Sequence, residues 1–182
     1  MILYRCFAWN AQAPRASADG PLWFPRPFQG EGRHDNPDLY GCLYSAEQPA
    51  SCLVEHFSKF RGRIAKPSWL QRRGLPVALA ALELPDREAL IDLDDPAVLN
   101  REQLRPSRVA TRNREVTQSQ ARVLFTSHSA ALGLRWWSTF EASWINVTLF
   151  DRATALLRVH DVRTLTLEDP EVIDAAHTLG LR

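Results

Sequence analysis

The chain has 182 residues, and 22 basic against 21 acidic side chains leave a formal net charge of +1. This balance argues against a surface built as a whole for nucleic acid or for an anionic membrane. The length predicts a single domain over residues 1–182, large enough to form a core without disulfides or zinc. The three cysteines include no CxxC pair, so we expect no disulfide framework and no metal site. No apolar run reaches the ~20 residues of a membrane span, and the N-terminus has no signal-peptide pattern, so we expect a cytoplasmic protein.

The first part of the chain predicts a strand followed by a long loop. The apolar start MILYRCFAW is typical of a strand. Residues 10–37 contain Pro and Gly at short intervals, which excludes a long helix or a central strand. Because this segment also carries Trp23, Phe24 and Phe28, we expect the loop to pack against the domain and to frame a site.

The remaining chain predicts helices and strands in irregular alternation, which is typical of an α+β protein. Two Asp-Pro pairs, at Asp95 and Asp169, predict capped helix starts, and Thr117-x-x-Gln120 resembles a capping box. Apolar periodicity predicts the other elements. We expect strands over 39–44, 76–84, 89–93, 134–137 and 145–150, helices over 45–60, 95–104, 117–130 and 169–180, and a basic linker over 59–73.

Residue types that suit one site occur in a regular order. Arg33 lies in the long loop, Tyr44 ends a predicted strand and Glu55 lies on a predicted helix, with eleven positions from the first to the second and again from the second to the third. Ser138 ends a late strand, and Arg5 lies in the first one. This order resembles the RES domain family, which is named for its arginine, glutamate and serine, and the resemblance covers nearly the whole chain.

The resemblance implies an ADP-ribosyltransferase-like fold with mixed or antiparallel sheets flanked by helices. It implies a toxin that cleaves the nicotinamide–ribose bond of NAD+ with water or phosphate as acceptor, and that is neutralised by a separate Xre-type antitoxin. NAD+ is then the substrate, phosphate a candidate co-substrate, and no further cofactor or nucleic acid is expected. By the same resemblance Glu55, Arg33, Tyr44 and Ser138 are catalytic, and Arg5 joins Arg33, Tyr44 and Ser138 in binding NAD+.

The chemistry of these residue types agrees with that reading. Cleavage of an N-glycosidic bond passes through an oxocarbenium-like state, which a carboxylate such as Glu55 stabilises. The guanidinium fork of Arg33 or Arg5 suits a diphosphate. The ring of Tyr44 can stack on the departing nicotinamide, and Ser138 can donate a hydrogen bond to a phosphate or ribose oxygen.

The loop around Arg33 departs from the family's pattern. Many members have a doubled glycine and an aromatic residue there, whereas Glu31 and His34 occupy those flanks in this chain. The sequence therefore leaves the shape of this loop open.

Several alternatives also stay open. A protein side chain can replace water or phosphate as acceptor, which would make the protein an ADP-ribosyltransferase. The basic segment 59–73, with Trp69 for base stacking, is compatible with a non-catalytic RNA-binding or interaction module. This segment, or 105–122, can instead dock an acidic antitoxin or attract the dinucleotide. Cys52 and His56, four positions apart, could form a nucleophile–base pair or half a metal site. A homodimer is a further open alternative.

Overall fold

The computed structural model describes residues 1–85 and 89–181 and confirms the α+β class. Within these residues the strands form a mostly antiparallel sheet in the order β3-β4-β1-β2-β7-β6-β5, in which β5 and β6 pair in parallel and β8 pairs with the free side of β4. The strands are β1 Ile2–Ala8, β2 Cys42–Ala46, β3 Gln71–Arg72, β4 Leu75–Glu83, β5 Leu90–Asp92, β6 Gly133–Trp137, β7 Ile145–Phe150 and β8 Arg158–Thr164.

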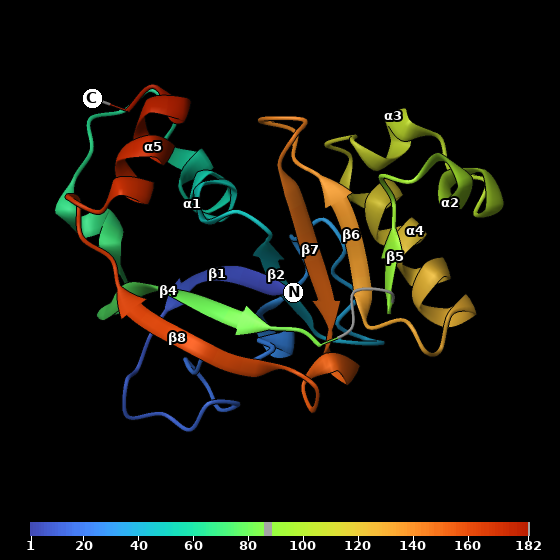
Figure 1. The fold of residues 1–182 in the computed structure, drawn as a ribbon, viewed down its shortest axis with the longest axis horizontal. Coiled ribbons are helices and arrows are strands. Elements are labelled where there is room, and N and C mark those ends of the chain that lie inside the picture. The colour runs from blue at the N-terminus through green and yellow to red at the C-terminus, as the bar shows by residue number, and fades with distance from the viewer. Residues whose placement is uncertain (86–88, 182) are drawn as a thin grey trace.

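Two groups of helices cover the two halves of this sheet (Figure 1). Helices α1 and α5 pack with β1 and β4, and helices α2, α3 and α4 pack with β5, β6 and β7, each group around its own apolar cluster. The helices are α1 Pro49–Phe57, α2 Pro96–Arg101, α3 Pro106–Val109, α4 Arg114–Ser127 and α5 Pro170–Leu179, with 3-10 turns η1 Arg26–Phe28, η2 Ser58–Phe60, η3 Pro67–Leu70 and η4 Asp151–Ala153. Within the described residues 1–85 and 89–181, no helix is long and apolar enough to cross a membrane.

The sheet changes direction at the junction of β1 and β2. These strands pair at Tyr4↔Ala46, whereas β1 pairs with β4 along its whole length. Figure 1 shows the strands on the two sides of this junction running in markedly different directions. Because α1 begins directly after β2, it lies beside this junction, where side chains from both halves of the sheet can meet.

The boundaries of β2 and α1 correct the sequence prediction. The predicted strand over 39–44 is displaced to 42–46, because Tyr40 closes a turn with an isolated bridge to Asn36. The predicted helix start at Ser45 was wrong, since Ser45 belongs to β2 and the helix begins at Pro49. A proline fits the first turn of a helix, where its missing N–H costs no hydrogen bond.

The start of α4 is also different from the prediction. Asn113, and not Thr117, caps this helix, because its side chain accepts a hydrogen bond from the N–H of Val116. Thr117 is buried inside the helix, and its hydroxyl donates to the carbonyl of Arg33 at 2.6 Å. The apparent capping box therefore reflects a long-range contact of the threonine.

Two further segments differ from their predicted states. The expected basic linker over 59–73 forms η2, η3 and β3, and within it Trp69 stacks on Phe60 with 4.0 Å between ring centroids. This face of Trp69 is therefore already occupied by a protein ring. Strand β8 was not predicted, because its sequence RVHDVRT has no clear apolar alternation and half of it faces solvent at the side of the sheet.

Arg135 ties three parts of the fold together by ion pairs. Its side chain is largely buried, and it donates to Glu47 at 2.7 Å and to both oxygens of Asp92 at 2.9 and 2.8 Å. These contacts join β6 to β5 and to the turn between β2 and α1. Removing Arg135 would leave the two carboxylates without their shared cation.

We expect Arg135→Ala to lower the free energy of unfolding by about 2–3 kcal/mol, measured by urea denaturation. The control is Arg101→Ala, which removes an exposed ion pair with Glu102 and should change stability by at most about 0.5 kcal/mol. Equal effects of the two substitutions would contradict the structural importance of the Arg135 cluster.

Candidate active site

A cleft with a volume of about 560 Å³ opens between α1 and the ends of β6 and β7. This size is typical of small-molecule sites. Its walls come from both halves of the sheet, from the long loop and from the segment between α3 and α4. The lining residues are Cys6, Gly32, Arg33, Tyr44, Ser45, Cys52, Glu55, His56, Ser58, Arg61, Arg112, Arg114, Trp136, Thr139, Phe140 and Asn146.

Glu55 is a half-buried carboxylate on the α1 side of the cleft. Its Oε1 accepts hydrogen bonds from Ser138 Oγ at 3.1 Å and from Asn146 Nδ2 at 3.0 Å. Asn146 in turn accepts from Ser51 Oγ at 2.9 Å, and Ser138 accepts from the N–H of Phe140 at 3.2 Å. Among the described residues no donor reaches Oε2, so the network fixes the carboxylate through one oxygen and leaves the other for a ligand.

Arg33 is buried at the opposite wall. Its Nη1 donates to the carbonyls of Val109 at 2.9 Å and Thr111 at 2.8 Å, and its guanidinium lies 4.6 Å from the ring centroid of Trp136. Burial, with a smaller contribution from Arg114, lowers the pKa of Arg33. The side chain still carries its charge at neutral pH, and it joins the long loop to the segment before α4.

Asp35 determines the shape of the loop that carries Arg33. Its carboxylate accepts from the N–H groups of Gly30 and Gly32 at 2.9 and 2.7 Å and from the Tyr44 hydroxyl at 2.7 Å. A Cβ on Gly32 would lie only 2.4 Å from the Tyr44 hydroxyl and 2.6 Å from the Asp35 carboxylate. A side chain at position 32 would therefore displace the Tyr44 hydroxyl or the Asp35 carboxylate from this turn.

Tyr44 contributes its ring to the cleft and its hydroxyl to the loop. The hydroxyl donates to Asp35 and accepts from the N–H of His34 at 2.9 Å. Burial, together with the neighbouring Cys42 and Asp35, raises the pKa of Tyr44 well above its usual value. The phenol is thus neutral and fully hydrogen-bonded, so its ring is the part that can meet a ligand.

His34 replaces the aromatic residue expected beside Arg33 and acts as a buried packing residue. One ring nitrogen lies 2.8 Å from Thr148 Oγ1, and the ring packs edge-on against Trp136. Burial lowers the pKa of His34 well below its usual value, with Arg33 adding to the effect. The neutral imidazole of His34 therefore packs where many members of the RES family have an aromatic side chain.

The structure brings Arg33, Tyr44, Glu55 and Ser138 to the cleft or its wall, but it does not bring Arg5 there. Arg5 is buried, and its Nη1 donates to the carbonyl of Pro21 at 2.6 Å and, at 3.4 Å, to that of Gly20. Burial lowers its pKa to about 10. Its visible role is to anchor the long loop to β1.

Several cleft residues were not singled out by the sequence analysis. Asn146 lies in a mostly apolar strand, and a buried polar side chain there indicates a hydrogen-bond partner. Arg112 and Arg114 fall inside the basic region 105–122, which the sequence indicated only as a region. Arg61 similarly belongs to the basic segment 59–73. The sequence could not tell which of these arginines face the cleft.

Cys52 and His56 line the cleft but are both in neutral forms. Burial raises the pKa of the Cys52 thiol to about 12 and lowers the pKa of His56 to about 4. A neutral thiol beside a neutral imidazole is not an activated nucleophile. In the described ranges 1–85 and 89–181, no group of three or more His, Cys, Asp or Glu side chains could hold a metal ion.

Comparisons with known proteins identify relatives of the chain at the level of family and fold. The family model described as RES domain matches residues 2–169. No match was found among curated proteins. A chain of the M. tuberculosis MbcT-MbcA toxin-antitoxin complex has a similar structure, with a TM-score of 0.63 and 17% sequence identity over 100% of this chain and 88% of that chain. At this identity the likeness shows the fold alone.

The neutral His56 predicts a pH dependence of stability. Its folded pKa of about 4 lies below the ordinary value of 6.5, so between these values the unfolded chain binds a proton that the folded chain does not. Stability should therefore fall as the pH falls through this window. We expect this loss to be shallower in His56→Gln than in the wild type, by up to about 1.4 kcal/mol per pH unit and by less where water in the cleft reaches the ring. Urea unfolding between pH 7.5 and 4 measures the difference, and identical slopes would show that His56 is not held neutral.

Proposed function

This chain belongs to the RES domain family, and we propose that it is a toxin-type enzyme that cleaves the nicotinamide–ribose bond of NAD+. The observation that carries the proposal is the carboxylate of Glu55, held by Ser138 and Asn146 in a cleft whose other wall is cationic.

The charges and rings of the cleft support a dinucleotide substrate. Arg33, Arg61, Arg112 and Arg114 line a space that also contains Glu55, which makes most of the wall attractive to a diphosphate. Aromatic rings from three segments of the chain line the same space and offer flat faces for a nicotinamide or adenine ring. These rings are Tyr44, Trp136 and Phe140.

In the proposed reaction the bond between ribose C1 and the nicotinamide nitrogen breaks, and its electron pair leaves with the nitrogen. The cationic nicotinamide thereby departs as a neutral molecule, and the ribose becomes oxocarbenium-like. Glu55 stabilises this positive charge, and its orientation is fixed beforehand by Ser138 and Asn146. A water or phosphate oxygen then forms the new bond to C1, and when water attacks, one proton is released.

A separate antitoxin is part of the proposal. The structural neighbour comes from a toxin-antitoxin complex, and the RES family resemblance implies an Xre-type partner. The proposed substrate is an intracellular dinucleotide, so we place the activity in the cytoplasm, where such a partner would restrain it.

The proposal predicts that Glu55→Gln loses at least about a hundredfold of the rate of nicotinamide release from NAD+. The amide keeps the size of the side chain and removes the charge that stabilises the ribosyl cation. The measurement follows nicotinamide release by the purified protein with and without inorganic phosphate. Phosphate dependence indicates phosphorolysis, whereas transfer of labelled ADP-ribose to protein indicates a protein acceptor.

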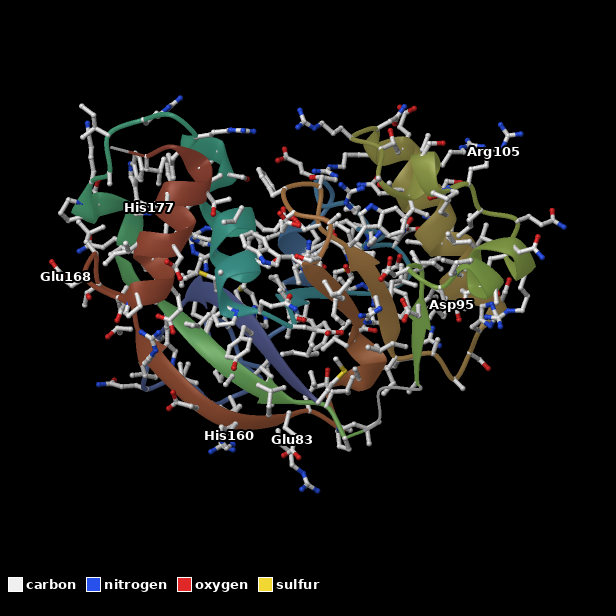
Figure 2. All side chains as sticks on the ribbon, turned by 45° about the horizontal axis from the view of Figure 1, so that its top comes forward. Glu83, Asp95, Arg105, His160, Glu168 and His177 are labelled. Atoms are coloured by element: carbon white, nitrogen blue, oxygen red, sulfur yellow. The ribbon has the colours of Figure 1, made fainter. Side chains whose placement is uncertain are left out.

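Glu168→Gln is the matched control, because Glu168 is exposed and lies just before α5, away from the cleft (Figure 2). It should retain the wild-type rate. Undiminished nicotinamide release by a folded Glu55→Gln protein would contradict the role of Glu55, and no release by the folded wild type would contradict the reaction itself.

A further inference from the structure

Arg112 and Arg114 are two cleft-lining charges to which the RES resemblance gives no role. Both side chains are exposed on the segment that leads from α3 into α4. Neither forms a salt bridge with any residue in the described part of the chain, whereas Arg122 pairs with Asp38 and Arg135 with Glu47 and Asp92. Arg112 and Arg114 thus line the cleft without an ion-paired carboxylate among the described residues.

The segment that carries these arginines is fixed from the Arg33 side. The carbonyls of Val109 and Thr111 accept from Arg33 Nη1, so the chain just before Arg112 is tied to the long loop. On the other side, Thr117 Oγ1 donates to the carbonyl of Arg33. Hydrogen bonds to Arg33 therefore fix the backbone on both sides of the two arginines, before Arg112 and after Arg114.

The same contacts limit what Arg33 can do for a ligand. Both N–H groups of its Nη1 donate to carbonyls. The edge formed by Nη1 and Nη2 therefore cannot form a bidentate contact with a phosphate. Arg114 lies close enough to contribute to the lowered pKa values of Arg33 and His34. Like charges gathered in this way repel one another, and a bound anion would relieve that repulsion.

We propose that Arg112 and Arg114 form the subsite that binds the substrate's diphosphate, and that Arg33 is a positioning residue that holds this subsite opposite Glu55. The inference rests on the proposed function for the identity of the substrate and assigns its diphosphate to residues outside the family's named set. The remaining end of the substrate, with the nicotinamide ribose, then lies toward Glu55.

ADP is the probe, because it contains the diphosphate and has no nicotinamide bond to cleave. We expect the double variant Arg112→Gln/Arg114→Gln to bind ADP at least about tenfold more weakly than the wild type in isothermal titration calorimetry. The control Arg105→Gln/Arg108→Gln also removes two charges, from exposed residues that do not line the cleft, with Arg105 at the outer side of the same helical region (Figure 2), and it should change ADP affinity less than about twofold. With NAD+, the KM of the double variant should rise by more than its kcat falls.

The positioning role of Arg33 has its own readout. Arg33→Lys keeps the charge but loses the planar fork that spans the two carbonyls, so ADP binding should weaken. If Arg33 acts through Arg112 and Arg114, adding Arg33→Lys to the double variant should cause little further loss. Fully additive losses would instead make Arg33 an independent ligand and overturn this part of the proposal.

The outcomes separate this inference from the proposed reaction. ADP affinity that is unchanged in the double variant, or absent in the folded wild type, would overturn the subsite even if nicotinamide is released. ADP binding that depends on Arg112 and Arg114 in a wild-type protein that releases no nicotinamide would support the subsite while the proposed cleavage fails.

Discussion

The hydrogen bonds that Glu55 accepts from Ser138 and Asn146 join α1 to the ends of β6 and β7. Helix α1 itself follows β2, which meets β1 at one residue pair where the sheet changes direction. The apolar face of α1, with Leu53 and Phe57 buried, sets the position of the helix, but apolar packing does not orient a carboxylate. The two neutral donors supply that orientation, and they offset part of the cost of placing a charge in a half-buried site. The fixed position of this carboxylate is the reference point from which the roles of the other cleft residues are inferred.

The opposite wall is built independently, from the long loop and the start of α4. The buried carboxylate of Asp35 collects two backbone N–H groups and the Tyr44 hydroxyl, and Arg33 ties the resulting turn to the segment before Arg112. The cleft thus has an anionic point on one wall and a cationic surface on the other. A substrate that is negative at its diphosphate and becomes positive at its ribose during bond cleavage would be both oriented and stabilised by this separation of charge.

Local patterns in the sequence predicted the parts of the fold and site that depend on neighbouring residues. The strand over 145–150 and the helix start after Asp95 are where the sequence placed them. Tyr44 and Glu55 both line the cleft because β2 leads directly into α1. Long-range contacts decided the rest. Arg5 resembles an anion ligand in the sequence, but its side chain is buried and its Nη1 donates to the carbonyls of Pro21 and Gly20. Thr117 looks like a helix cap until its contact with the Arg33 carbonyl is known. The arginines that line the cleft could not be chosen from a basic stretch, because their direction depends on how α4 packs.

In the proposed complex one substrate spans the two walls, with its ribose at Glu55 and its diphosphate at Arg112 and Arg114, where α4 begins. A crystal structure of the protein with a non-cleavable NAD+ analogue, in which carbon replaces the ring oxygen of the nicotinamide ribose, tests this most directly. The account predicts that the ribose C1 lies beside the Glu55 carboxylate and that the diphosphate contacts Arg112 and Arg114. An analogue bound outside the cleft, or bound with its diphosphate away from these arginines and its nicotinamide ribose out of reach of Glu55, would contradict it.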